Sequence, residues 1–98
     1  MTKYKGFNSR LVHGQGLHDP LGSVTMPIYQ TSTFGFRSAE HGAACFAGED
    51  DGFIYTRIGN PTIDEFEAAI ADMEGGYNGI ATASGMAAVN TVYLTYLG

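Results

Sequence analysis

Two short runs of the sequence carry groups suited to binding an anion. In the run Tyr-Thr-Arg, alternation along an extended backbone places Tyr55 and Arg57 on the same side, so a phenol and a guanidinium can converge on one oxyanion. In the second run, Ser84 and Gly85 form a turn of small residues ahead of a predicted helix that continues through Met86. The first backbone N–H groups of a helix have no partner inside it, and the helix dipole adds positive potential there. Each run therefore predicts a place that could hold a phosphate.

On the residues alone, both runs also have a simpler interpretation. A surface arginine packed beside a core tyrosine gives the same pattern as the first run, and most turns between a strand and a helix bind nothing. Arg57 is the notable cation because the whole chain has only 5 basic residues. These alternatives stay open at this point.

The other residue types that could do chemistry give weaker patterns. His13, His18 and Asp19 could in principle form a metal site, but histidines in loops are usually solvated and no H-E-x-x-H helical pair is present. Cys45 is interpreted as a small apolar residue rather than a nucleophile, because no base lies nearby in the sequence. We therefore predict no metal site.

The clearest element between the two runs is a helix over residues 62–74. Asn60 offers a capping side chain and Pro61 suits a first turn, while Thr62 and Glu65 also fit a T-x-x-E capping box. Its apolar residues recur at helical spacing and form one stripe: Ile63, Phe66, Ala69, Ile70 and Met73. Gly75 and Gly76 are expected to end the helix.

The remaining elements are shorter. Residues 79–83 suit a buried strand and residues 86–97 a helix, which together frame the second run. Residues 1–53 are predicted to be extended and irregular because glycine, proline, serine and threonine recur every few residues. Within them, residues 24–36 suit a strand or an extended arm, and residues 39–47 a short helix.

The composition excludes several classes of protein. With 5 basic against 10 acidic residues, the net charge of -5 argues against a nucleic-acid partner and against an anionic membrane surface. Residues 75–98 carry no charge, but polar and glycine residues interrupt them, so we expect elements covered by other protein rather than a membrane span. The N-terminus lacks an apolar secretory segment, and the single Cys45 fits a reducing compartment, so the expected location is the cytoplasm.

Three ordered motifs closely resemble the Cys/Met-metabolism branch of fold-type I pyridoxal-phosphate enzymes. They are residues 55–62 (YTRIGNPT), 74–76 (EGG) and 83–88 (ASGMAA). Residues 27–34 (PIYQTSTF) are similar to the N-terminal arm of that family, and residues 42–49 (GAACFAGE) are most similar to its methionine-cleaving members. The resemblance covers essentially the whole chain, in register.

The resemblance implies an α/β fold. Residues 1–58 would form an extended N-terminal arm and clamp segment for the neighbouring subunit. Residues 59–98 would begin the large domain of the fold-type I, aspartate aminotransferase-like transferases, with helix, strand, phosphate-cup turn and helix. The resemblance also implies a homo-oligomer, a dimer of dimers whose sites are shared between subunits.

The cofactor implied by the resemblance is pyridoxal 5'-phosphate. Tyr55, Thr56 and Arg57 match the family motif that reaches the phosphate of the neighbouring subunit's cofactor. The backbone N–H groups of Gly85 and Met86 match the turn that holds the phosphate of the chain's own cofactor.

The activity implied by the resemblance is that of a carbon–sulfur lyase acting on a sulfur amino acid, by elimination or by replacement. The family's chains are several times longer, and their cofactor-binding lysine would lie beyond residue 98. We therefore expect no catalytic residue within this chain, and we expect the chain to be the N-terminal portion of an enzyme. The alternative is a non-catalytic module that joins the oligomer of a full-length relative; a downstream reading frame that encodes the lysine segment would decide between them.

Overall fold

Four helices joined by extended segments are seen in the computed structural model, which describes residues 5–14 and 19–98. In chain order they are α1 (Phe7–His13), α2 (Ala39–Phe46), α3 (Pro61–Met73) and α4 (Gly85–Leu97). No strand is assigned within the described residues, and an isolated antiparallel bridge joins Thr33 to Tyr55.

The predicted helix before the second run is confirmed at both ends. The Asn60 side-chain oxygen accepts a hydrogen bond from the backbone N–H of Thr62 at 2.8 Å, and Pro61 occupies the first turn. At the other end Gly75 has a φ of 64°, and the N–H of Gly76 donates to the Ala71 carbonyl at 2.7 Å. This is the glycine-terminated geometry expected for a helix that stops sharply.

The predicted capping box is wrong. Thr62 lies inside α3 rather than at its cap, because Asn60 already occupies that position. The Thr62 hydroxyl instead accepts a hydrogen bond from the Tyr29 N–H at 2.9 Å and donates one to the Pro27 carbonyl at 3.1 Å. The residue therefore fastens the extended segment before α2 to the start of α3.

The other two predicted helices are confirmed with small differences at their ends. Helix α2 begins after Ser38, whose hydroxyl accepts the N–H of His41 at 3.0 Å, and it ends one residue before the expected limit. Helix α4 starts at Gly85, one residue earlier than predicted, with Ser84 as its cap. Both starts follow a serine because its oxygen satisfies an N–H group that the helix leaves free.

Two predictions about the irregular regions are wrong. Residues 1–53 contain a second helix, α1, which packs against α3 and is tied to it by an ion pair of 3.3 Å between Arg10 and Asp72. The contact with α3 thus stabilises α1, although the apolar residues of α1 show little helical periodicity. Residues 79–83 form no strand, since a strand needs a neighbour and none lies beside it among the described residues. The Ala81 N–H instead donates to the Glu67 carboxylate at 2.6 Å.

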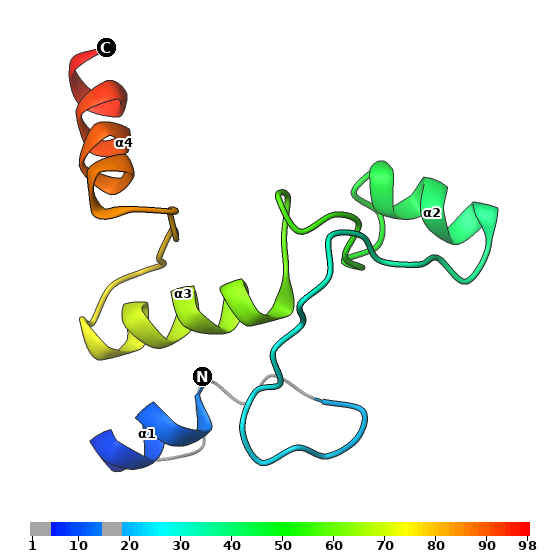
Figure 1. Cartoon of the computed structure of the whole chain (residues 1–98), viewed down its shortest axis with the longest axis horizontal. Helices are drawn as coiled ribbons and strands as arrows, with labels where there is room; N and C mark the ends of the chain where they lie inside the picture. Colours follow the sequence, from blue (N-terminus) through cyan, green and yellow to red (C-terminus); the bar gives the residue numbers. More distant parts are fainter. Residues whose placement is uncertain (1–4, 15–18) are drawn as a thin grey trace.

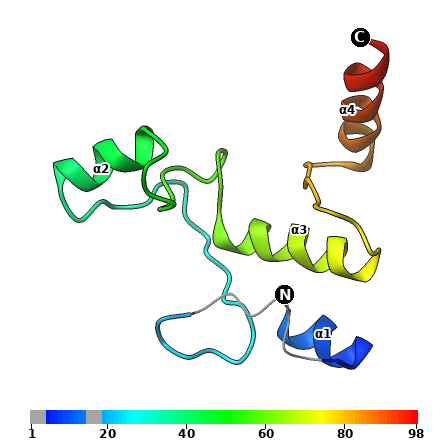
Figure 2. The ribbon, with the colours of Figure 1, turned by 180° about the vertical axis from the view of Figure 1, so that it is seen from behind.

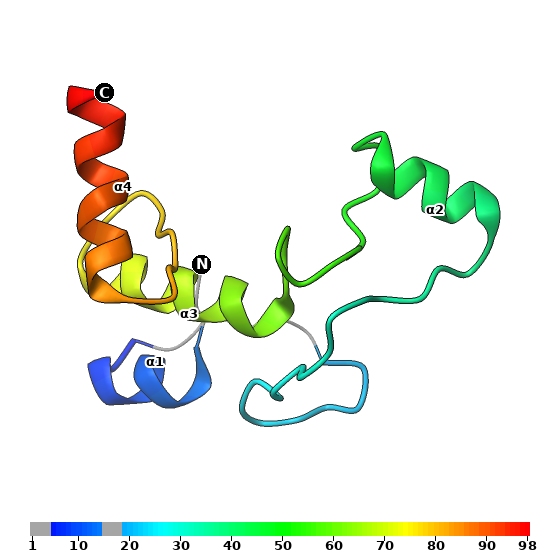
Figure 3. The ribbon, with the colours of Figure 1, turned by 45° about the horizontal axis from the view of Figure 1, so that its top comes forward.

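The elements are spread out rather than folded around one core (Figures 1 and 2). Helices α2 and α4 lie at opposite ends with α3 between them, and α1 lies alongside α3 (Figure 3). The radius of gyration is 15.7 Å, against about 13 Å for a compact chain of this size. Within the described part of the chain, Cys45 and Ala71 are the buried apolar residues. No helix there is both long and apolar enough to cross a membrane.

Candidate functional site

The first predicted anion-binding run lies in a turn held against the extended segment before α2. The Thr56 N–H donates to the Ser32 carbonyl at 2.8 Å, and the Phe34 N–H donates to the Ile54 carbonyl at 3.0 Å. The chain then turns, since the Ile58 N–H returns to the Tyr55 carbonyl at 2.8 Å. Two segments far apart in sequence thereby fix the backbone from which Tyr55 and its neighbours project.

The two side chains expected to converge in this run do lie together. The guanidinium carbon of Arg57 lies 5.5 Å from the centroid of the Tyr55 ring, within the range of a cation–π contact. The backbone is a turn rather than the extended run assumed from alternation. Arg57 is exposed and forms no ion pair with any described residue. Its positive charge is therefore available to an anion.

An open groove of about 570 Å³ lies beside this pair. The extended segment forms one wall and the turn forms the other, with the lining residues Tyr29, Gln30, Thr31, Ser32, Tyr55, Thr56 and Arg57. Hydroxyl, amide and guanidinium groups line it without any carboxylate. Such a lining suits an anionic group.

Thr56 and Asn60 hold this turn in place. The Thr56 hydroxyl donates to the Thr31 carbonyl and accepts a hydrogen bond from the Asn60 amide nitrogen at 3.1 Å. Asn60 is only 2% exposed, and the same nitrogen donates to the Tyr29 carbonyl at 2.9 Å. Sequence reasoning assigned Asn60 only as a helix cap. The available signal was that capping uses the side-chain oxygen alone, which leaves an NH₂ group that must be satisfied when buried.

The second predicted run forms the first turn of α4. The Ser84 hydroxyl accepts the N–H of Ala87 at 3.1 Å, while the N–H groups of Gly85 and Met86 have no acceptor among the described residues. All three residues of the run are exposed, and no atom lies within 4 Å of the point where a Cβ on Gly85 would sit. Two free N–H groups therefore face open space at a positive helix end.

The two runs are not brought together within this chain. The turn at Tyr55 lies next to the first turn of α3, whereas the start of α4 lies toward the other end of that helix (Figures 1 and 2). Helix α3 has 13 residues and is therefore about 20 Å long. Within the described chain the two runs therefore lie apart, near opposite ends of α3.

The interpretation of Cys45 is wrong in one respect. A base does lie close to it, because His41 Nε2 is 3.5 Å from the thiol sulfur, one helical turn earlier on α2. Burial raises the pKa of the Cys45 thiol, and the nearby charge of Asp50 raises it further. The thiol therefore stays protonated near neutral pH. The signal that was missed is the i, i+4 spacing of His41 and Cys45 on a helix that the sequence did predict.

The group of His13, His18 and Asp19 is only partly described, since His18 lies outside the described residues. The Asp19 carboxylate accepts the Ser23 N–H at 2.9 Å and the Tyr29 hydroxyl at 3.3 Å. The backbone hydrogen bond from Ser23 holds the pKa of Asp19 below its usual range. This carboxylate therefore has a structural use in closing a turn.

Solved structures with the same arrangement of elements place this chain among pyridoxal-phosphate-dependent enzymes. A Campylobacter jejuni protein whose structure carries N'-pyridoxyl-lysine-5'-monophosphate matches with a TM-score of 0.74 at 38% identity, over 87% of this chain and 21% of that one. Cystathionine gamma-lyase of Lactobacillus plantarum matches with a TM-score of 0.70 at 37% identity, over 94% of this chain and 22% of that one. Residues 8–98 match the family described as Cys/Met metabolism PLP-dependent enzyme, and the chain belongs to that family.

Relatives within the family share close to half of their residues with this chain. The L-methionine gamma-lyase of Pseudomonas putida is 48% identical over 97 residues, which are 98% of this chain and 24% of that protein. The O-acetyl-L-homoserine sulfhydrylase of Corynebacterium glutamicum is 42% identical over 94 residues, which are 95% of this chain and 22% of that protein. The chain thus spans about a quarter of the length of the curated relatives it matches.

The cofactor of the family is pyridoxal phosphate, and the residues present fit its phosphate group. Among the described residues, one run offers an exposed guanidinium without a carboxylate partner beside a phenol, and the other offers two N–H groups without an acceptor at a helix start. Both are arrangements that bind phosphate oxygens in proteins.

Proposed function

We propose that the full-length protein is a pyridoxal-phosphate-dependent carbon–sulfur lyase that cleaves L-methionine. The observation that carries the proposal is the 48% identity to an L-methionine gamma-lyase along 97 residues, a stretch that includes both anion-binding runs. The net reaction converts L-methionine and water into methanethiol, ammonia and 2-oxobutanoate. The cofactor supplies the electron sink for this chemistry, and the protein supplies binding and orientation.

The residues of this chain would bind and orient the phosphate from two sides. Arg57 would form charge-assisted hydrogen bonds to its oxygens, and the Tyr55 hydroxyl would donate another. Thr56 would belong to the same site chiefly by fixing the turn, since its hydroxyl is already bonded to Thr31 and Asn60. The N–H groups of Gly85 and Met86 would hold the phosphate at the start of α4.

These two half-sites would serve different active sites of a dimer. The separation of the turn from the start of α4 supports this arrangement, because one chain alone does not bring the two halves together (Figure 1). Residues 1–58 would form the arm and clamp, with α1 remaining docked on α3, and residues 59–98 would begin the α/β large domain. The assembly would be a homotetramer built from two such dimers, in a reducing cytoplasm that keeps the buried Cys45 thiol free.

The proposed reaction is tested on the full-length protein with two substrates. We expect L-methionine alone to yield methanethiol and 2-oxobutanoate in equal amounts. The second candidate is replacement at the γ-carbon, which the 42% identity to an O-acetyl-L-homoserine sulfhydrylase favours. Turnover of O-acetylhomoserine with sulfide, together with no 2-oxobutanoate from methionine, would overturn the lyase assignment in favour of replacement.

The proposed phosphate contact is tested by comparing two arginines. We expect Arg57→Ala to lose bound cofactor on dialysis while Arg37→Ala retains it, as followed by the absorbance of the bound cofactor. A hydrogen bond to a charged group is worth about 1.5–3 kcal/mol, so retention should fall by at least tenfold. Arg37 is a fair control because its side chain is 79% exposed and lies 3.9 Å from Asp50, in a different part of the chain. Equal retention in the two variants would remove Arg57 from the site.

A further inference from the structure

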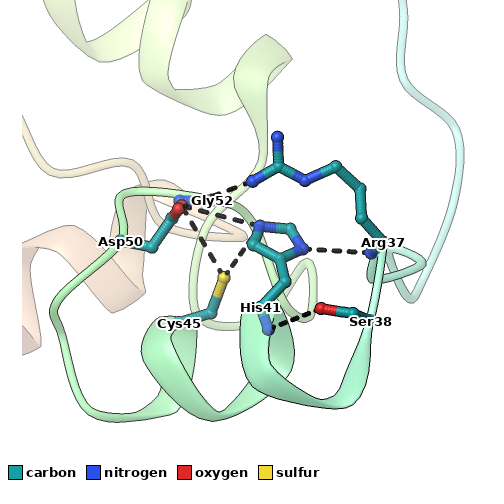
Figure 4. A network of polar contacts seen from close by, with 6 residues as sticks. All are labelled: Arg37, Ser38, His41, Cys45, Asp50 and Gly52. Carbon is teal, nitrogen blue, oxygen red and sulfur yellow. Dashed lines mark hydrogen bonds and ion pairs between the residues drawn. The ribbon is translucent and has the colours of Figure 1, made fainter.

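Three potential metal ligands meet between α2 and the loop that follows it (Figure 4). His41 and Cys45 project from the same face of α2, and Asp50 reaches back from the loop. His41 Nε2 lies 3.5 Å from Cys45 Sγ and 3.7 Å from Asp50 Oδ1, and the sulfur lies 3.8 Å from that same oxygen. Imidazole nitrogen, thiol sulfur and carboxylate oxygen thus form a nearly equilateral triangle.

The size of this triangle matches the coordination sphere of zinc. The nearest point equidistant from three atoms with these separations lies in their plane, about 2.1 Å from each of them. Zinc bonds to nitrogen, oxygen and sulfur ligands are about 2.0–2.3 Å long. A fourth ligand draws the ion slightly out of that plane, so the three atoms need to move closer together by a few tenths of an ångström to bind it.

The surroundings hold the Asp50 carboxylate in place and leave space beside all three ligand atoms. The Gly52 N–H donates to Asp50 Oδ1 at 2.8 Å, which orients the carboxylate toward the helix. A Cβ on Gly52 would lie 3.0 Å from both Asp50 Oδ1 and Cys45 Sγ, and 3.4 Å from His41 Nε2. Any larger residue at this position would crowd all three ligand atoms. Cys45 is only 6% exposed, so its sulfur has little contact with bulk water.

We propose that His41 Nε2, Cys45 Sγ and Asp50 Oδ1 bind a single Zn²⁺ ion that ties the loop after α2 to the helix, with water as the fourth ligand. The ligand set is one that zinc uses, and a thiolate with an imidazole selects it over Mg²⁺ or Ca²⁺. One thiolate and one carboxylate balance the two positive charges of the ion. This site lies apart from the two phosphate-binding runs and goes beyond the proposed function.

Proton transfers accompany binding in a defined way. Before the metal binds, His41 Nδ1 accepts the exposed backbone N–H of Arg37 at 3.1 Å, so the ring proton sits on Nε2. Metal binding moves that proton to Nδ1 and releases the Arg37 N–H to water. The Cys45 thiol gives its proton to solvent, and Asp50 is already ionised because the Gly52 N–H holds its pKa below the usual range. The free energy lost with this one exposed hydrogen bond is small compared with the free energy gained from three metal–ligand bonds.

The proposal is tested by metal binding to the full-length protein after treatment with a chelator. We expect one equivalent of Zn²⁺ to bind in competition with a chromophoric chelator, and Co²⁺ to give a thiolate-to-metal charge-transfer band. Cys45→Ser should abolish the band and weaken Zn²⁺ binding at least tenfold. Gly52→Ala, which keeps all three ligands, should weaken it as well because its methyl group crowds them.

The control is a variant of an exposed acid in the same loop, Glu49→Gln, which should bind Zn²⁺ like the unchanged protein. Absence of the charge-transfer band in the unchanged protein would overturn the proposal without reference to any variant. Equal Zn²⁺ affinity in Cys45→Ser would overturn it too, since the ion would then occupy another site.

Discussion

Asn60 is the residue on which the geometry of the turn at residues 55–58 depends most. Its oxygen caps α3, while its amide nitrogen bonds both the Tyr29 carbonyl and the Thr56 hydroxyl. One side chain that is 2% exposed thus joins the extended segment, the turn and the helix. A buried side chain with this many partners is costly to alter, because each broken bond leaves a desolvated group.

Asn60→Asp separates these roles, since the acid retains the capping oxygen and loses the donor. We expect it to lower the free energy of unfolding of the full-length protein by about 1–3 kcal/mol, because two half-buried acceptors lose their partner. Urea unfolding followed by circular dichroism measures this. The matched control is Asn78→Asp, where the exposed side chain only accepts the Gly79 N–H at 2.8 Å and can continue to do so. Similar losses in the two variants would contradict the assigned role of Asn60.

The raised pKa of Cys45 predicts slow alkylation in the metal-free protein. Burial, and then the charge of Asp50, raise this pKa, so the thiolate fraction at pH 8 is smaller than that of a free cysteine. Asp50→Asn removes the charge and lowers the pKa, so Cys45 should react several-fold faster with iodoacetamide at pH 8. Mass spectrometry of the Cys45 peptide over time measures the rate.

Glu49→Gln serves as the control for alkylation, because it removes an equal charge from an exposed neighbour that does not contact the sulfur. It should leave the rate unchanged. An Asp50→Asn protein that reacts no faster than the unchanged protein would show that this carboxylate does not govern the thiol.

At the scale of elements, helix ends were predictable where a local signal sets them. Asn60, Ser38 and Ser84 each place an oxygen where a helix start leaves an N–H free, and Gly75 adopts the positive φ that stops α3. Helix α1 was missed because its stability comes from contact with α3 rather than from its own seven residues. A strand at residues 79–83 was predicted wrongly because periodicity says nothing about whether a partner strand is present.

The glycine that ends α3 gives a prediction at this scale. Gly75 has a φ of 64°, and no atom lies within 4 Å of the position that an added methyl group would take, so Gly75→Ala adds backbone strain without a clash. We expect a loss of about 1 kcal/mol in the free energy of unfolding of the full-length protein. Gly76→Ala is the matched control, because its φ is not positive and its Cβ would make ordinary contacts of 3.7–3.9 Å. A loss at Gly76 as large as at Gly75 would contradict this account.

At the scale of the whole molecule, the described chain leaves most of its apolar side chains uncovered. On α4, Leu94 is 73% exposed and Tyr96 is 81% exposed, and Phe66 on α3 is 58% exposed. The sequence indicated this by the absence of charge after Glu74. It pointed to both proposed phosphate-binding runs but not to the walls of the groove, since the contact between residues 31–34 and 54–56 is a tertiary pairing without a local signal.

The exposed apolar faces predict the behaviour of the 98-residue polypeptide on its own. We expect it to associate or to unfold without a sharp transition, because large apolar patches bind one another in water and few side chains are buried. Size-exclusion chromatography and a thermal melt followed by circular dichroism measure both properties. A well-behaved monomer with a cooperative melt would contradict the expectation.

The proposed sharing of sites between subunits gives the prediction with the widest reach. If the turn at Arg57 and the start of α4 act on one phosphate, the roughly 20 Å length of α3 between them favours two different chains as their source. In one full-length chain, Arg57→Ala removes the clamp. In the other, the cofactor-binding lysine of the longer sequence is replaced. Each chain alone should be inactive, and the two are mixed, unfolded and reassembled.

The two arrangements then give opposite results. With sites shared between chains, a mixed dimer has one site that collects both defects and one that collects neither, so activity should return at about half of the normal value per mixed dimer. With sites built from single chains, every site keeps one defect and the mixture stays as inactive as its parents. Mixed dimers are verified by tags of different mass. Unchanged chains taken through the same procedure control for reassembly itself, and activity of reassembled Arg57→Ala chains alone would show that Arg57 is dispensable.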